Sequence, residues 1–135
     1  MRLSIPGLDE SDGEVFSKIS AGKYPLQIKG VDVDKVAKNT AKYPGNPLIT
    51  IKCAIPTGEE HEGHSITFSL MYPDETLPED IRNQCIGRIK RFLIAVGLDS
   101  EEDGFDSDEL LGLTFLADIS VNGKYNQVDD YLPIS

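Results

Sequence analysis

Several residue types are scarce in this chain of 135 residues, and each scarcity argues against a class of protein. Two cysteines are too few for the disulfide framework of a small secreted domain. No apolar run reaches the roughly 18 residues that a membrane-spanning helix needs. The first 14 residues, MRLSIPGLDESDGE, lack the apolar core of a signal peptide. We therefore expect a protein of a reducing, cytoplasmic compartment that does not enter a membrane.

Positive charge is also scarce, because 13 lysines and arginines face 23 acidic residues and leave a net charge of -10. The charges nevertheless alternate in blocks along the chain. Residues 18–52 hold seven lysines and two aspartates, residues 53–81 seven acids and no base, residues 82–98 four bases and no acid, and residues 99–110 seven acids and no base. Such blocks favour a polarised surface. The alternative is that the acidic blocks are solvated loops that keep the protein soluble.

The length and the ordinary apolar content of 39% suit one folded domain. We expect an acidic N-terminal segment over residues 1–15 and a single domain over residues 16–135. Phe16 and Ile19 are the expected points at which the chain docks onto that domain.

Alternating apolar residues predict five strands. The expected strands are KYPLQIKGVDV (23–33), LITIKCAI (48–55), HSITFSL (64–70), LLGLTFLADISV (110–121) and YNQVDDYLP (125–133). An Asn-Gly turn joins the last two. In the second strand Cys53 faces inward with the isoleucines, whereas Thr50 and Lys52 face outward.

Helical periodicity replaces the alternation in residues 76–97. Thr76 and Glu79 fit a capping box, Pro78 suits the first turn, and Gly97 suits a C-terminal stop. Cys85 lies on the apolar stripe of this helix and, like Cys53, is expected to be a buried small hydrophobe.

The predicted order is β-β-β-α-β-β, a mainly β protein with one helix. Five alternating strands and a one-sided helix predict a five-stranded, OB-fold-like barrel whose open end the helix plugs. The alternative is a twisted antiparallel sheet with the helix packed on one face.

The order and spacing of five segments carry a resemblance over about residues 16–133. The segments are ISAGKYPLQIKGVDV, GNPLITIKCAI, EGHSITFSL, RIKRFLIAVGL and FDSDELLGLTFLADISVNGKYNQVDDYLP. This succession resembles a family of short proteins from phage and prophage replication modules, long catalogued as of unknown function, which looks like OB-fold single-stranded DNA-binding proteins. The resemblance implies largely sequence-independent binding of single-stranded DNA in replication or recombination, in the cytoplasm of a bacterial host.

Two features depart from that family's pattern. Bacterial single-stranded DNA-binding proteins usually end in an acidic tail, whereas here YLPIS ends almost at the last expected strand. The family's last strand tends to be basic, whereas this one carries Asp129 and Asp130.

Single-stranded nucleic acid is held by cations that neutralise phosphates and by aromatic rings on which bases stack. In an OB-fold the first loop and the last hairpin flank a binding face on the second and third strands. The predicted nucleic-acid-binding residues are Lys35, Lys38, Lys42, Tyr43, Thr50, Lys52, Lys124 and Tyr125. The alternative is a solvated lysine loop with Tyr43 packed on the rim of the barrel.

Other residue patterns predict no enzyme, no metal and no cofactor. His61 and His64 in EEHEGH lack the second Cys or His pair of a structural zinc site. The aspartate pairs 32/34 and 129/130 have no catalytic partner at a suitable spacing. No phosphate-binding glycine loop or nucleophile motif is present in the sequence.

The acidic loop over residues 99–109 is expected to lie away from DNA and to recruit replication or recombination proteins. A different function remains open, an acidic phage-encoded adaptor or inhibitor that binds a host protein with carboxylates in place of phosphates. The two functions differ in whether the lysine loop and the acidic blocks share one face.

Overall fold

The computed structural model describes residues 18–98, 105–123 and 125–134, and it shows a mainly β protein with one α-helix. The elements are β1 (Gly22–Asp32), β2 (Leu48–Ala54), β3 (Ser65–Met71), α2 (Glu79–Ala95), the 3-10 helix η1 (Ser107–Leu110), β4 (Thr114–Asn122) and β5 (Tyr125–Leu132). The predicted order of strands and helix is confirmed, and η1 is an addition. The predicted acidic segment 1–15, Phe16, Lys124 and residues 99–104 of the acidic loop lie outside the described residues.

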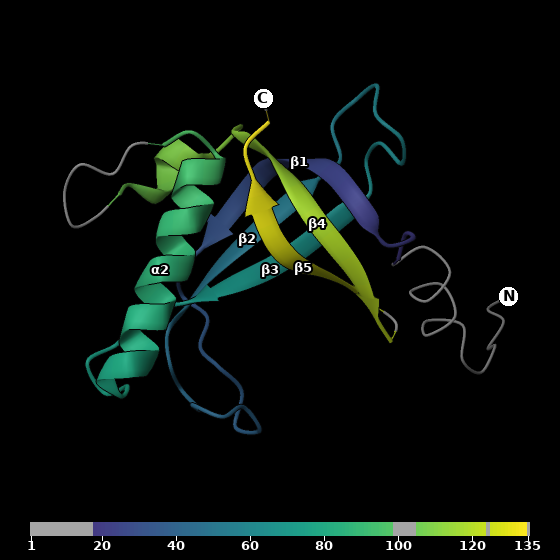
Figure 1. The fold of residues 1–135 in the computed structure, drawn as a ribbon. Coiled ribbons are helices and arrows are strands. Elements are labelled where there is room, and N and C mark those ends of the chain that lie inside the picture. Colours follow the sequence, from purple (N-terminus) through teal and green to yellow (C-terminus); the bar gives the residue numbers. More distant parts are fainter. Residues whose placement is uncertain (1–17, 99–104, 124, 135) are drawn as a thin grey trace, which may run out of the picture.

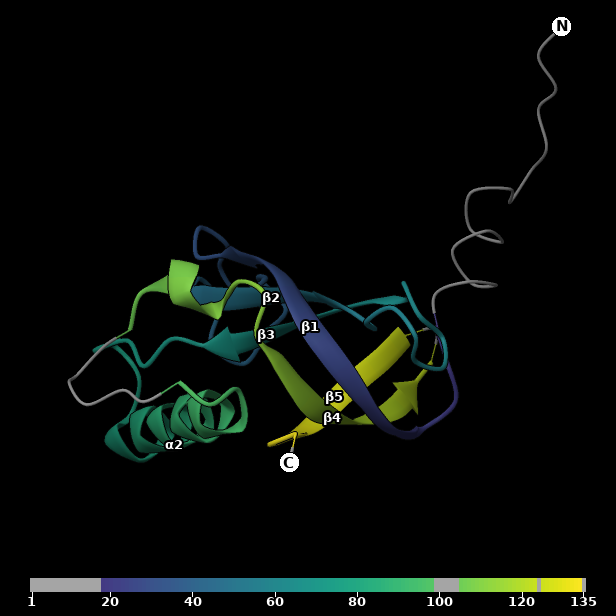
Figure 2. The ribbon, with the colours of Figure 1, turned by 90° about the horizontal axis from the view of Figure 1, so that it is seen from above.

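The five strands form one antiparallel sheet in the order β3-β2-β1-β4-β5. The central strand β1 pairs with β2 and β4, so that Ile28 lies opposite Cys53 and Leu26 lies opposite Phe115. A register shift between Ile28 and Gly30 marks a β-bulge, a feature that bends a strand. Figure 2 shows β2 and β3 on one side and β4 and β5 on the other, with β1 crossing between them. The sheet is therefore strongly curved.

The curvature brings the two edge strands together at an aromatic cluster. The ring centroids of Phe68 in β3 and Tyr131 in β5 lie 5.5 Å apart. Phe92 of α2 lies edge-on to both rings, at 5.7 and 5.4 Å, and also to Phe115 of β4 at 5.4 Å. Such edge-to-face pairs stabilise a core beyond their buried area. Among the described residues, however, no hydrogen-bonded ladder joins β3 to β5.

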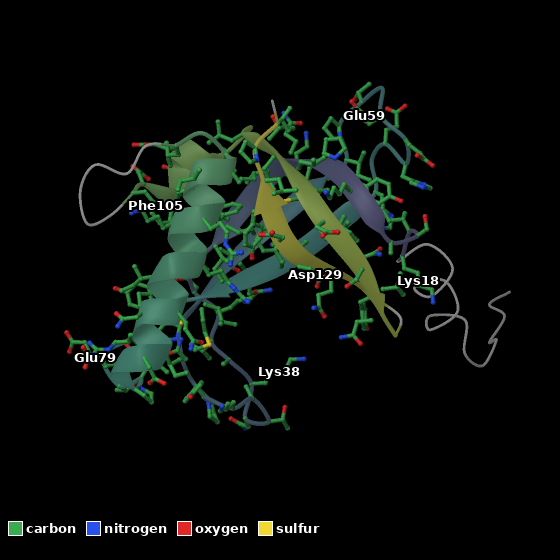
Figure 3. All side chains as sticks on the ribbon, in the orientation of Figure 1. Lys18, Lys38, Glu59, Glu79, Phe105 and Asp129 are labelled. Carbon is green, nitrogen blue, oxygen red and sulfur yellow. The ribbon has the colours of Figure 1, made fainter. Side chains whose placement is uncertain are left out.

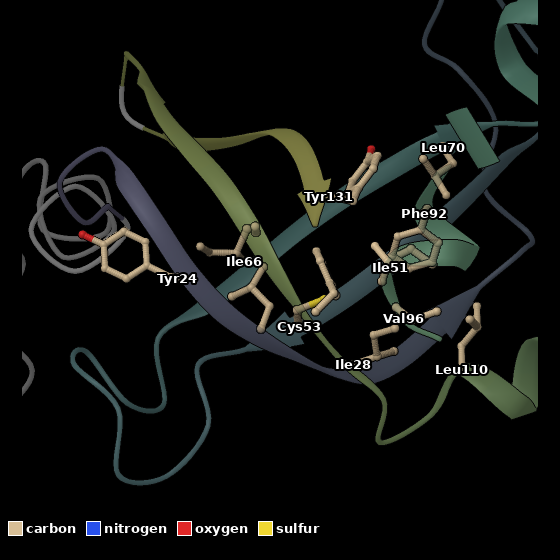
Figure 4. Packing of buried hydrophobic residues seen from close by; sticks show 14 of the residues in the cluster. Tyr24, Ile28, Ile51, Cys53, Ile66, Leu70, Phe92, Val96, Leu110 and Tyr131 are labelled. Carbon is tan, nitrogen blue, oxygen red and sulfur yellow. The ribbon is translucent and has the colours of Figure 1, made fainter. Parts of the chain in front are cut away.

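The core fills the concave side of the sheet and the apolar face of α2 (Figure 4). The predicted inward residues of β1 and β2 are buried, and so are Phe115, Ala117 and Ile119 of β4. Leu113 is only partly buried, and Val121, predicted to face inward, is exposed because it lies at the end of β4 beyond the core. Ile19 packs against the core as expected. Both cysteines are free, buried thiols, Cys53 in β2 and Cys85 in α2, which confirms that prediction.

The helix α2 ends as predicted but begins differently. Gly97 has a φ of 77°, and the amide of Leu98 donates to the carbonyl of Leu93 at 3.0 Å, which closes the C-terminal turn. The predicted capping box is wrong, because no side chain caps the first turn. The Thr76 hydroxyl donates instead to the Asp74 carboxylate, and that hydrogen bond lowers the pKa of Asp74. No helix in the described part of the chain has the length and apolar character to cross a bilayer.

Candidate nucleic-acid interface

The lysine loop, residues 33–47 between β1 and β2, continues the hairpin as an ordered structure (Figure 1). Val36 forms an isolated β-bridge with Pro47, and the amide of Leu48 donates to the carbonyl of Lys35 at 2.9 Å. These bonds fix the base of the loop to the start of β2. Lys35, Lys38 and Lys42 project from it into solvent (Figure 3 labels Lys38).

Asn46 joins the lysine loop to the end of β3. This residue is only 5% exposed, and its Nδ2 donates to the carbonyl of Pro47 at 2.9 Å and to the carbonyl of Tyr72 at 3.0 Å. Its backbone carbonyl accepts from the amide of Ala37 at 2.9 Å. Asn46 therefore joins the lysine loop to the end of β3, through its side chain and its backbone together. The GNP motif that precedes β2 contains this residue, but a polar residue in a turn motif is expected to be exposed, and its burial could not be predicted.

The lysines of this region are available to an external anion. The Nζ of Lys42 lies 5.7 Å from the ring centroid of the half-buried Tyr43, a cation–π contact that leaves the charge unneutralised. Within the described residues, no carboxylate forms an ion pair with Lys35, Lys38, Lys42 or Lys52.

The outward face of β2 carries Lys52 but does not expose Thr50. Lys52 is exposed between Gly30 of β1 and Thr67 of β3, and a Cβ at Gly30 would lie only 3.7 Å from its Cδ. The aliphatic part of the lysine therefore lies across that glycine. Thr50 was predicted as an exposed contact, yet it is 3% exposed and its hydroxyl is hydrogen-bonded to Ser69 at 3.1 Å. Because β2 is paired on both sides, the short side chain of Thr50 is enclosed by the neighbouring residues Asp32 of β1 and Ser69 of β3.

Tyr125 lies at the opposite end of the sheet from the lysine loop. The turn between β4 and β5 lies beyond the start of β1, where Gly22 pairs with Ile119, whereas the lysine loop follows the end of β1 (Figure 1). Tyr125 is 68% exposed. The structure therefore does not gather the predicted residues into one cluster. It places lysines at one end, Lys52 in the middle and Tyr125 at the other end.

A groove that the sequence did not reveal runs between the edge strands β3 and β5. Two adjoining hollows of about 590 and 480 Å³ share Thr67, Tyr125 and Asn126, and we call the continuous depression the seam groove. Residues 63–69 line one wall, and residues 125–129 with Tyr131 line the other. The aromatic cluster, through Phe68 and Tyr131, closes its floor at the end nearest α2.

Arg88 of α2 lines this groove and is the site residue that sequence reasoning missed. It is exposed and has no ion-pair partner in the described part of the chain, whereas Arg91 pairs with Asp130 at 3.2 Å. Both arginines lie close enough to Tyr131 to lower the pKa of its hydroxyl, although burial, the larger effect, raises that pKa. The signal for Arg88 in the sequence is the block of four bases without an acid in residues 82–98, whereas the periodicity of the helix indicates only packing.

The carboxylates are distributed over both ends of the molecule. The turn between β2 and β3 carries Glu59, Glu60 and Glu62 at the end of β2 remote from the lysine loop, as the labels of Glu59 and Lys38 in Figure 3 show. Glu79, at the start of α2, lies at the same end as Lys38 in that view. The acids of the β2–β3 turn therefore lie away from the lysine loop, whereas Glu79 lies at the same end of the molecule and Asp34 lies within the loop itself.

The two histidines lie in different surroundings. The His61 ring packs edge-on against Tyr24 at 5.8 Å between centroids, whereas His64 lines the seam groove. Among the residues described, no group of three or more His, Cys, Asp or Glu side chains is arranged to hold a metal ion.

No protein-family model matches this chain, and no curated protein matches it.

Proposed function

We propose that this chain is a single-stranded DNA-binding protein of largely sequence-independent affinity, and that its curved sheet is a partly open barrel of the OB-fold type. The observation that carries the proposal is a set of lysines, unpaired within the part of the chain that the structure describes, that adjoin the outer face of β2 and β3, together with a groove beside that face rimmed by an exposed tyrosine. Cations along a groove and an aromatic platform are the two features that hold single strands.

These residues lie in an order that suits a nucleic-acid strand crossing the sheet. The lysine loop meets the start of β2, Lys52 follows in the middle of β2, and Thr67 lies opposite Lys52 on β3. Thr67 in turn lines the seam groove together with Tyr125. A nucleic-acid strand along this path has its phosphates contacted by the lysines at one end and a base stacked on Tyr125 at the other.

A single strand fits this surface better than a duplex does. Stacking on Tyr125 or Tyr43 needs an exposed base face, and a duplex keeps those faces inside its stack. The backbone contacts and the stacking surface carry little sequence information, because every base offers a π-face. A role in a phage or prophage replication or recombination module rests on the sequence resemblance. We propose binding for this chain and no catalytic step.

The proposal is tested by fluorescence anisotropy with labelled oligo-dT, duplex DNA and single-stranded RNA of equal length, each titrated at several salt concentrations. We expect oligo-dT to bind more tightly than the duplex. Its log affinity should fall linearly with log salt, by about 0.7 for each phosphate contact. Absence of binding to any nucleic acid at low salt would overturn the proposal and would favour the acidic adaptor.

A further inference from the structure

The two walls of the seam groove differ in chemistry. Ser65, Thr67 and Ser69 of β3 are exposed and uncharged. Lys52, on the neighbouring strand β2, lies opposite Thr67. Arg88 adds a second cation at the end nearest α2. This wall offers hydroxyl donors and positive charge, which are groups that bind phosphate oxygens.

The wall on β5 suits bases. Tyr125, Gln127 and Asp129 are all exposed and line the groove. A register shift between β4 and β5 leaves Asp129 without a partner on β4. The Gln127 amide donates to Asp129 Oδ1 at 2.8 Å, which holds the carboxylate in place, and Asp129 Oδ2 accepts no hydrogen bond from the described residues. A carboxylate repels phosphates, but it accepts hydrogen bonds from the amino groups of bases.

Unpaired main-chain groups add to the polar lining. β3 and β5 are the two edges of the sheet, and no strand among the described residues pairs with their outer edges. Edge strands present N–H and C=O groups in rows. A groove of about 480 Å³ between two such edges lies within the size range of small-molecule sites, about 300 to 1,000 Å³.

We propose that an unpaired nucleic-acid strand lies in the seam groove with its phosphates toward β3 and Arg88 and its bases toward β5, and that Asp129 makes the groove favour bases that carry an exocyclic amino group. This inference rests on the proposed function. It adds an orientation of the strand and a chemical preference among bases. Tyr125 stacks one base at the turn end of the groove, and Asp129 accepts a hydrogen bond from the amino group of a neighbouring base.

The base preference is tested with two oligonucleotides on the same deoxyribose backbone, one of cytosine and one of uracil, at equal length and salt. Cytosine carries an amino group where uracil carries a carbonyl. We expect the unsubstituted protein to bind the cytosine oligonucleotide about fivefold more tightly, the effect of one hydrogen bond. Asp129→Asn, which removes the charge at constant size, should reduce the preference below twofold. Asp108→Asn, an exposed acid on η1 outside the groove, should leave it unchanged.

The orientation is tested by salt titration of two helix variants. Arg88→Gln should flatten the slope of log affinity against log salt by about 0.7. Lys90→Gln, an exposed helix residue that does not line the groove, should not change the slope.

The outcomes separate the inference from the proposed function. Equal affinity for the two oligonucleotides, a preference for uracil, or an unchanged slope in Arg88→Gln would overturn the inference while binding itself stood. Failure to bind either oligonucleotide at low salt would overturn both.

Discussion

At the scale of single residues, Asn46 joins the lysine loop to the end of β3. Its side chain donates to two carbonyls, those of Pro47 and Tyr72, and Asn46→Ala would leave both without that donor in a buried place. We expect a loss of about 1 to 2 kcal/mol in the free energy of unfolding, measured by urea denaturation. Asn39→Ala, on the exposed part of the same loop, should cost less than about 0.5 kcal/mol. Equal effects of the two substitutions would show that Asn46 does not hold the loop.

Cys53 makes the stability of the protein depend on pH in alkaline solution. Burial raises the pKa of its thiol from 9.0 to about 12. Between these values the folded chain keeps a proton that the unfolded chain releases. The contribution is therefore fully present below pH 9 and falls by about 1.4 kcal/mol for each pH unit above it.

Cys53→Ala should remove this part of the pH dependence. The substitution also costs core volume, so the quantity to compare is the change in unfolding free energy between about pH 8 and about pH 10, and not its absolute value. Tyr131, whose pKa burial also raises, contributes equally to both proteins. A pH dependence that Cys53→Ala leaves unchanged would contradict the account of this thiol.

At the scale of elements, two glycines have opposite effects on α2: one lies inside the helix and weakens it, and the other follows its C-terminal end and allows the chain to turn there. Gly87 lies in the helix, and a Cβ there would meet no atom within 4 Å, whereas Gly97 has a φ of 77°. Gly87→Ala should stabilise the protein by about 0.5 to 1 kcal/mol. Gly97→Ala should destabilise it by about 1 to 2 kcal/mol, because a side chain disfavours the left-handed conformation. Thermal unfolding followed by circular dichroism compares the two, and effects of the same sign would refute this reading of the helix.

The elements themselves could be predicted, because side-chain periodicity is a local property. The alternation of Tyr24, Leu26 and Ile28 requires one buried face, and the stripe from Cys85 to Val96 requires a helix, whatever the partners are. The helix start was harder to predict. The Thr76 hydroxyl can bond either to the first turn of the helix or to the carboxylate of Asp74. In the structure it donates to Asp74, and the first turn has no side-chain cap.

Features that depend on the curvature of the sheet could not be predicted from the sequence. Thr50 and Lys52 lie two residues apart and face the same side of β2, but only the longer side chain of Lys52 reaches past its neighbours to solvent. The seam groove is formed by β3 and β5, strands more than fifty residues apart, whose approach depends on the twist of three intervening strands. The predicted residues that are exposed are Lys35, Lys38, Lys42, Lys52 and Tyr125. Their placement at opposite ends of the sheet follows only from the topology.

At the scale of the whole molecule, an acidic protein presents positive charge locally. The acids of the turn between β2 and β3 lie at the end remote from the lysine loop, so they do not neutralise it. The acids at the start of α2 lie nearer to it and should weaken binding at low salt, where electrostatic forces reach furthest. The lysine loop and Lys52, and not the net charge of -10, should therefore decide the affinity for a phosphate backbone.

The most direct measurement of this claim is the salt dependence of oligo-dT binding by a protein in which Lys35, Lys38, Lys42 and Lys52 are all replaced by glutamine. Glutamine keeps the aliphatic part of each side chain, and circular dichroism shows whether the fold is retained. The account predicts weaker binding at low salt and a slope of log affinity against log salt that is smaller by about 2.8, or 0.7 for each lysine. A folded variant that bound oligo-dT with the affinity and slope of the parent would contradict it.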